Sequence, residues 1–297
     1  MSTDSSMKSG VYTAIVTPFR NGQVDEKALE ELVERQAAGG VDGIVAVGTT
    51  GESPTLSFEE HIGVIEKTVR AAAGRVKVIA GAGANSTAEA VGLTREAERV
   101  GADGLLQVAP YYNKPSQEGL YRHFMEIARN TSLPIILYNI PSRCGVEIDV
   151  ETVLRLARDA DNVVGLKEAG GRPDRVARIA AAVRKPFTLL SGDDSLTLPF
   201  MAVGAEGVIS VASNLAPAEV SRMVRAFREG RLEEARALHG RLYPLFKALF
   251  IETNPAPIKA ALAIKGWIAE ELRLPLVPVR QESRERIRDA MAMCGLL

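Results

Sequence analysis

Eight short apolar segments recur along the first two-thirds of the chain and constrain its fold more than any other feature. They start 20 to 33 residues apart, at Val11, Gly43, Val76, Gly104, Pro134, Val163, Phe187 and Gly207. Each interval leaves room for one helix, and continuous apolar runs are typical of parallel strands that are buried on both faces. The spacing predicts an α/β protein with a closed (β/α)8 TIM barrel rather than an open, doubly wound sheet.

Helix signals occupy the intervals and continue beyond the last apolar run. Asp25 is a predicted helix cap, Ser57 with Glu60 and Ser86 with Glu89 form capping-box patterns, and Pro217 suits a first helical position. After about residue 230 the periodicity is helical only, over 232–251, 256–267 and 282–293. We therefore expect a catalytic barrel over residues 1–229 and a C-terminal helical domain over 230–297.

The overall charge excludes several classes of partner. The chain has 297 residues, with 36 basic and 37 acidic side chains and a formal net charge of −1, so no global field would attract nucleic acid or an anionic membrane. The N-terminal segment lacks the apolar centre of a secretory signal, and no run reaches the roughly 20 apolar residues of a membrane span. We expect a cytoplasmic protein with a small-molecule substrate, in which Cys144 and Cys294 are free thiols.

One local pattern could support a dinucleotide site. Gly81-Ala-Gly83-Ala-Asn85 follows a predicted strand and precedes a helix. The pattern lacks the third glycine of the fingerprint and belongs to the third strand instead of the first. It is therefore a weak match.

In a TIM barrel the active site lies at the carboxyl ends of the strands. The polar residues that end the eight runs are Thr17; Thr49, Thr50 and Glu52; Asn85; Tyr111 and Tyr112; Tyr138 and Arg143; Lys167 and Glu168; Ser191, Asp193 and Asp194; and Ser213 and Asn214. The three histidines, His61, His123 and His239, fall in predicted helices. No histidine is therefore expected at the strand ends, where a Ser-His-Asp triad or a His-ligated zinc would need one. We expect chemistry without a metal or organic cofactor.

Lys167 is the one lysine among these strand ends and closes the apolar run from Val163. Burial favours the neutral, nucleophilic amine, which suits imine formation with a keto acid. Thr49, Thr50 and Gly51 could supply hydrogen-bond donors for a carboxylate, and Tyr138 could carry a proton. The plain alternative is a rim lysine that forms an ion pair with the adjacent Glu168.

The other candidates also have plain alternatives. Tyr111 and Tyr112 could be packing aromatics, and Glu52 a charge at a helix end. Asp193 and Asp194 precede a predicted helix and are expected to cap it. Arg143 could be a surface charge, or it could clamp a carboxylate through two parallel hydrogen bonds.

Seven motifs resemble those of the dihydrodipicolinate synthase family, within the pyruvate-lyase superfamily that also includes N-acetylneuraminate lyase. In chain order they are GTTGES (48–53), IAGAGAN (79–85), APYYNKPSQEGLYRHF (109–124), LYNIPSR (137–143), GLKEA (165–169), LLSGDD (189–194) and GVISV (207–211). The resemblance extends from about Val11 to the C-terminus.

The resemblance implies a role for each matched position. Lys167 forms the Schiff base with pyruvate, Tyr138 relays protons beside it, and Thr50 holds the pyruvate carboxylate. Thr49 links this relay to Tyr112 of a neighbouring subunit, which implies a homo-oligomer that is at least a dimer, and we expect a homotetramer. The remaining substrate contacts are Arg143, for the carboxylate of L-aspartate 4-semialdehyde, and the backbone of Gly192 and Ile209.

The family's lysine-feedback site is matched as well, although position 58 is Phe where lysine-sensitive relatives often have His. The matched residues are Ser53, Leu56, His61, Asn85, Glu89 and Tyr111. The plain alternatives are that Glu89 is only the capping-box partner of Ser86 and that His61 is only an imidazole on a helix surface.

The predicted activity is a Schiff-base lyase that joins pyruvate to L-aspartate 4-semialdehyde and gives 4-hydroxy-tetrahydrodipicolinate, in lysine and diaminopimelate biosynthesis. Two alternatives remain open. One is a superfamily lyase that cleaves a keto-sugar acid or N-acetylneuraminate through the same lysine, and Arg143 argues against it. The other is a non-catalytic barrel that senses lysine, which the Thr, Tyr and Lys set argues against.

Overall fold

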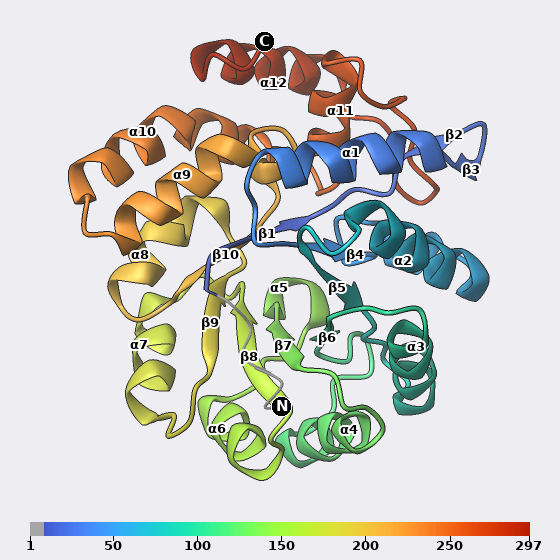
Figure 1. Cartoon of the computed structure of the whole chain (residues 1–297), viewed down its shortest axis with the longest axis vertical. Helices are drawn as coiled ribbons and strands as arrows, with labels where there is room; N and C mark the ends of the chain where they lie inside the picture. The colour runs from blue at the N-terminus through green and yellow to red at the C-terminus, as the bar shows by residue number, and fades with distance from the viewer. Residues whose placement is uncertain (1–8) are drawn as a thin grey trace.

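A closed barrel of eight parallel strands forms the centre of the molecule. A computed structural model describes residues 9–297 of the chain. Around the barrel each strand pairs with its neighbours in the order β1-β10-β9-β8-β7-β6-β5-β4, and β1 pairs with β4 to close it. The helices surround these strands (Figure 1). The predicted TIM barrel is confirmed.

The eight strands coincide with the eight apolar runs. They are β1 (Val11–Ala14), β4 (Gly43–Ala46), β5 (Lys77–Gly81), β6 (Gly104–Val108), β7 (Ile135–Asn139), β8 (Val163–Glu168), β9 (Thr188–Ser191) and β10 (Gly207–Ser210). Side chains alternate along the strands between an inner cluster, which includes Tyr12, Val45 and Leu106, and a larger outer cluster against the helices, and a register shift between β7 and β8 interrupts this alternation once. Both faces are buried, which explains the unbroken apolar runs.

Helices follow the strands as the spacing predicts. The barrel helices are α1 (Glu26–Ala38), α2 (Phe58–Ala72), α3 (Thr87–Arg99), α4 (Gln117–Arg129), α5 (Pro141–Cys144), α6 (Val150–Asp159), α7 (Pro173–Ala182), α8 (Thr197–Ala202) and α9 (Pro217–Arg228). Short 3-10 turns lie at η1 (Ser53–Thr55), η2 (Asp194–Leu196) and η3 (Ala212–Asn214).

The predicted caps are present, with one difference. Asp25 accepts a hydrogen bond from Ala28 N, and Ser57 with Glu60 forms a complete capping box. Ser86 accepts from Glu89 N at 3.4 Å, but no return bond from Ser86 N to the Glu89 carboxylate is present among the described contacts. The second predicted box is therefore only half formed.

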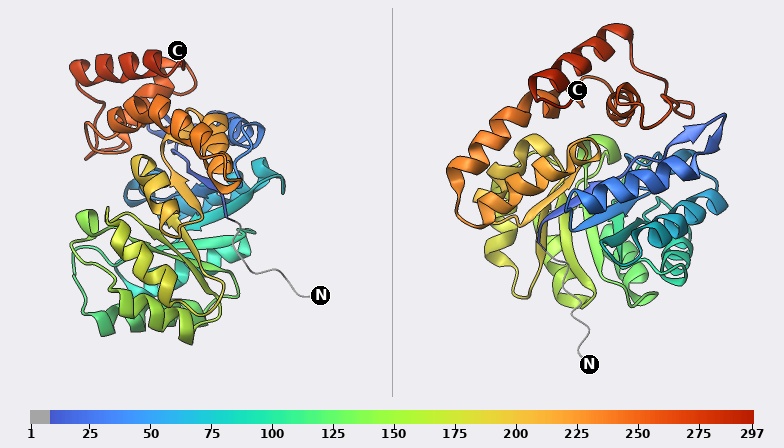
Figure 2. Two further views of the ribbon diagram at one scale, coloured as in Figure 1. Left: turned by 90° about the vertical axis from the view of Figure 1, so that its left-hand side faces the viewer. Right: turned by 45° about the horizontal axis from the view of Figure 1, so that its top comes forward.

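Three further helices lie beyond the barrel and cover one side of it (Figure 2). They are α10 (Leu232–Ala248), α11 (Ala256–Ile264) and α12 (Gln281–Met293), close to the predicted ranges. Helix α9 ends at Arg228 and α10 begins at Leu232, but α10 also packs on α9, so the domain division at 229/230 stays a prediction.

One element was not expected from the sequence. The first apolar run ends its barrel strand at Ala14, and β2 (Phe19–Arg20) then pairs with β3 (Gln23–Val24) in a small antiparallel hairpin.

Over residues 9–297, no helix is both long enough and apolar enough to cross a bilayer. The expectation that the N-terminus lacks a secretory signal concerns mainly residues 1–8, which lie outside the described residues.

Candidate active site

Lys167 and Tyr138 lie side by side on the inner face of the barrel. The two residues are paired in register on β8 and β7, and Lys167 Nζ lies 4.1 Å from the centroid of the Tyr138 ring. Lys167 is 5% exposed and Tyr138 is 4% exposed. Both side chains are therefore largely removed from bulk water on the inner face of the barrel.

Glu168 is not the ion-pair partner of Lys167. Its side chain points to the outer face and pairs with Arg175 of α7, with Glu168 Oε2 2.8 Å from Arg175 Nε. Within residues 9–297, no carboxylate lies within ion-pairing distance of Lys167 Nζ. The plain alternative of a rim lysine paired with Glu168 is therefore wrong.

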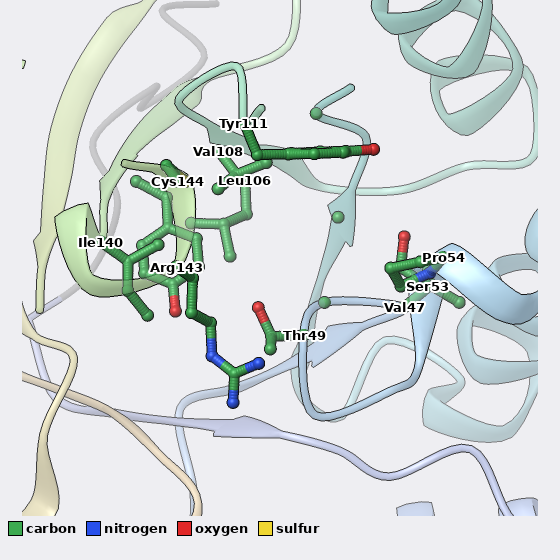
Figure 3. A pocket seen from close by; sticks show the side chains of 14 residues that line it. Val47, Thr49, Ser53, Pro54, Leu106, Val108, Tyr111, Ile140, Arg143 and Cys144 are labelled. Atoms are coloured by element: carbon green, nitrogen blue, oxygen red, sulfur yellow. The ribbon is translucent and has the colours of Figure 1, made fainter. Parts of the chain in front are cut away.

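A cavity of about 180 Å³ opens beside these residues at the carboxyl ends of the strands (Figure 3). It is lined by Thr49, Tyr138 and Arg143 together with Ser53 and Tyr111. The Arg143 guanidinium extends toward Thr49, and the Tyr111 ring lies across the cavity from it (Figure 3). Lys167 does not line the cavity itself, but its Nζ contacts the ring of Tyr138, which does.

The loop after β4 carries the two threonines. Thr50 is buried, and its Oγ1 accepts a hydrogen bond of 3.0 Å from Asn254 Nδ2, which leaves the hydroxyl proton available as a donor. Gly51 N donates to Gly48 O at 3.0 Å, so this amide is used inside the turn. The expectation that Gly51 supplies a free donor is wrong, whereas Thr49 and Thr50 keep their hydroxyls.

Arg143 and Gly192 line a second cavity that adjoins the first at Ile140 and Arg143. Its volume is about 650 Å³, and Asp193 and Asn254 also line it. Arg143 belongs to α5 rather than to a strand end, and its Nη2 donates to Asn254 O at 2.9 Å. A guanidinium has five N–H donors, so most of them remain free for a carboxylate in this cavity.

Two other predicted site residues have clear positions. Ile209 of β10 is 1% exposed, and its side chain belongs to the inner cluster with Tyr138. Tyr112 is 90% exposed and has a left-handed φ of 74°, and it lines neither cavity. The chain therefore does not bring Tyr112 to its own site.

Glu52 is not a charge at a helix end. It is 1% exposed with a left-handed φ of 54°, and its carboxylate pairs with Lys259 of α11 and accepts from Arg273 N at 3.1 Å. Lys259 is 0% exposed, and burial lowers its pKa to about 8 against the opposing effect of Glu52. The pair joins the threonine loop to the C-terminal helices.

The candidate feedback residues lie near the first cavity. Ser53 and Tyr111 line it, Asn85 Nδ2 donates to Tyr111 O at 3.2 Å, and burial followed by the charge of Glu89 raises the pKa of Tyr111. Leu56, which follows η1, packs half-buried against the outer core.

His61 is not a surface imidazole. It is 4% exposed, its Nε2 lies 2.8 Å from Gly81 O, and burial lowers its pKa. All three histidines lie in helices, as predicted. Cys144 and Cys294 are buried free thiols, also as predicted, and burial raises the pKa of Cys144 to about 11.

Asp193 and Asp194 differ in role. Asp193 caps the η2 turn by accepting from Ser195 N at 2.8 Å, as expected. Asp194 is buried and accepts from Ser210 Oγ, Val211 N and Ala212 N, so it holds the end of β10 instead of capping a helix. Burial raises the pKa of the Asp194 carboxyl despite these donors.

The glycines of the partial dinucleotide pattern have a packing role. A Cβ at Gly81 would lie 2.5 Å from Val47 O, and a Cβ at Gly83 would lie 2.4 Å from Val108 N. Neighbouring strand ends approach too closely here for any side chain. This close approach accounts for both glycines without a phosphate ligand.

Asn254 is the site residue that sequence reasoning missed. It lies in the segment between α10 and α11, is 5% exposed, and contacts both Thr50 and Arg143. The only local signal is its Asn-Pro dipeptide, which marks a turn but does not indicate where that turn packs.

The chain is similar to known proteins over nearly its whole length. The model of the "Dihydrodipicolinate synthetase family" matches residues 7–293. The 4-hydroxy-tetrahydrodipicolinate synthase of Syntrophus aciditrophicus is 53% identical over 98% of this chain and 100% of its own length.

Solved structures are equally similar. The synthase of Methylacidiphilum fumariolicum SolV superposes with a TM-score of 0.96 at 57% identity, over 97% of this chain and 96% of that one. The enzyme of Cyanidioschyzon merolae, solved with lysine bound, has a TM-score of 0.95 at 45% identity, over 97% and 99%. The chain belongs to the dihydrodipicolinate synthetase family.

Proposed function

We propose that the chain is a 4-hydroxy-tetrahydrodipicolinate synthase that condenses pyruvate with L-aspartate 4-semialdehyde through a Schiff base on Lys167. The observation that carries this proposal is the buried Lys167 amine, which contacts the Tyr138 ring at 4.1 Å and has no anionic partner within residues 9–297. The names of the full-length relatives supply the substrates.

The reaction begins when Lys167 Nζ attacks the ketone carbon of pyruvate. The carbinolamine loses water to give an iminium, whose positive nitrogen accepts the electron pair released when a methyl proton leaves. The resulting enamine carbon attacks the aldehyde of the semialdehyde. The amine of that substrate then adds to the iminium carbon, closes the ring and displaces Lys167.

The surrounding residues divide the remaining tasks. The Thr50 hydroxyl binds the pyruvate carboxylate, and Arg143 binds the carboxylate of the semialdehyde in the second cavity. Tyr138 passes protons to and from the reacting atoms through Thr49. The backbone of Gly192 and Ile209 completes the pocket. No metal or organic cofactor takes part in these steps.

Tyr112 completes the relay from a second subunit in this proposal. Its exposure of 90% leaves the phenol free to enter the site of another copy. The assembly is then a homodimer at least, and two dimers form the tetramer. We place the enzyme in the cytoplasm, where its buried cysteines stay reduced.

L-Lysine is the proposed feedback inhibitor. The lysine-bound relative supports it, as does the grouping of Ser53, Asn85, Glu89 and Tyr111 near the first cavity. The Glu89 carboxylate would bind an amino group of the ligand. His61 and Leu56 would support this site from α2 and the loop before it. Isothermal titration with L-lysine, using Glu89→Gln as the comparison, measures the binding.

A direct assay tests the proposed substrates. The enzyme should form product from pyruvate and L-aspartate 4-semialdehyde, and Lys167→Ala should reduce this rate to background. It should cleave N-acetylneuraminate and keto-sugar acids far more slowly. Efficient cleavage of these sugar acids with no turnover of the semialdehyde would contradict the proposal.

A further inference from the structure

We propose that Glu168 is a positioning residue, which acts through Asn139 and Arg175 to hold Lys167 against Tyr138. The inference rests on the proposed role of Lys167 as the Schiff-base lysine. It assigns a function in the reaction to a buried ionic cluster that touches neither substrate.

The cluster lies directly behind the two reacting side chains. Asn139 follows Tyr138 on β7 and Glu168 follows Lys167 on β8, and both pairs are in register across the two strands. Successive side chains of a strand point to opposite faces. The contacts of Glu168 on the outer face therefore fix the strand positions that present Lys167 and Tyr138 on the inner face.

The Glu168 carboxylate is saturated with donors. Asn139 Nδ2 lies 3.0 Å from each of its oxygens, Gly170 N donates to Oε1 at 2.6 Å, and Arg175 Nε donates to Oε2 at 2.8 Å. Glu168 is 1% exposed and Arg175 is 3% exposed. Loss of a donor from such a buried carboxylate leaves its charge less well compensated, so displacement of Glu168 from these donors is costly.

The cluster also connects to the rest of the site. Ile148 N donates to Asn139 Oδ1 at 3.0 Å, and the Arg175 guanidinium donates to Ile148 O. The backbone carbonyl of Glu168 accepts from Gly192 N at 2.8 Å. Displacement of Glu168 would thus move the backbone of the second cavity together with Lys167.

Gly170→Ala is the most selective test. The added Cβ would lie 2.6 Å from Glu168 Oε1 and would push the carboxylate away while every donor remains in the chain. Gly39→Ala is a matched control, because its Cβ would lie 2.5 Å from Pro217 Cβ at the contact of α1 with α9. Arg175→Met, which removes the cation, and Arg175→Lys, which keeps it, complete the set.

The measurement is the rate at which pyruvate forms a borohydride-trappable adduct at saturating concentration, with kcat and KM for pyruvate alongside. Gly170→Ala and Arg175→Met should slow adduct formation at least about tenfold, because a small misplacement of a reacting group is this costly. They should lower kcat more than they change KM. Arg175→Lys should recover part of the rate, and Gly39→Ala should react like the wild type.

The outcomes separate this inference from the proposed function. A wild-type adduct on a residue other than Lys167 would overturn both. An adduct on Lys167 whose rate of formation is unchanged in folded Gly170→Ala would overturn the positioning role alone. If Arg175→Met fails to fold, Gly170→Ala decides the question, because it keeps all ionic partners.

Discussion

The two cationic side chains of the site occupy very different environments at the scale of single residues. Lys167 is 5% exposed and lies against the Tyr138 ring. Arg143 is exposed and donates to the backbone carbonyl of Asn254. A dry amine suits nucleophilic attack, whereas a solvated guanidinium with free donors suits recognition of a charged substrate.

Arg143→Ala should chiefly impair use of the semialdehyde. A hydrogen bond to a charged group contributes about 1.5–3 kcal/mol, so kcat/KM for this substrate should fall about 10- to 100-fold. Steady-state kinetics with each substrate varied in turn measures the effect. An equal loss for pyruvate would contradict the assignment of Arg143 to the aldehyde.

At the scale of elements, the C-terminal helices hold the threonine loop in place. Asn254 contacts Thr50, and Lys259 of α11 pairs with Glu52. Arg273 donates to Thr55 O at 2.9 Å and pairs with Glu60 of α2. Thr49 lines the first cavity and Asn254 lines the second, so segments far apart in the chain meet at the site.

Lys259→Met should destabilise the protein by about 3 kcal/mol, because it leaves the buried Glu52 without its cation. Adding Glu52→Gln should restore much of that loss, since the double variant has no uncompensated charge. Urea unfolding of both single variants and the double variant gives a double-mutant cycle, which measures the interaction free energy between the two side chains. Strictly additive losses would show that the two side chains do not interact.

The Glu60–Arg273 pair should make stability depend on acidity. The hydrogen bond from Arg273 lowers the pKa of Glu60 from 4.5 to about 2. Between these two pH values Glu60 is protonated in the unfolded chain but still charged in the folded chain. The stabilisation by the pair is therefore complete above about pH 4.5 and is lost as the pH falls toward 2.

Glu60→Gln should cost ~1 kcal/mol at neutral pH, a modest value because the pair is partly exposed. The difference from the wild type should shrink steadily as the pH falls below 4.5. Urea unfolding of both proteins from neutral pH to below pH 4.5 measures this difference in stability. A difference that is the same at neutral and acidic pH would show that the charge of Glu60 is not responsible.

The barrel and the strand-end residues could be predicted because their signals are local. Apolar runs, caps and the position of Lys167 on its strand all follow from neighbouring residues. The Asn254–Thr50 contact joins residues 204 positions apart, and no local pattern encodes it. The roles of Glu52 and Asp194 do not follow from local sequence for the same reason, since their partners lie on distant elements.

At the scale of the whole molecule, one chain does not complete the proposed relay. Lys167, Tyr138, Thr49 and Thr50 gather in one barrel, while Tyr112 is 90% exposed and lines neither cavity. Closed, two-fold symmetric dimers exchange the same surface in both directions, so each subunit could supply the residue that the other lacks.

Mixing two inactive variants tests this exchange. In a mixed dimer of Tyr112→Phe and Lys167→Ala chains, the site with the intact lysine receives its tyrosine from the other chain. Activity should recover to roughly a quarter of the wild type, because half of random dimers are mixed and each has one intact site. No recovery after verified subunit exchange would place Tyr112 outside the relay.

The most direct test of the central claim is borohydride reduction of the enzyme with pyruvate, followed by peptide mass mapping. We predict a single adduct on Lys167, which is lost in Lys167→Ala and requires pyruvate. Lys259, the other deeply buried lysine of residues 9–297, should stay unmodified because it is 0% exposed and paired with Glu52. An adduct on any other lysine, with Lys167 unmodified, would contradict the account.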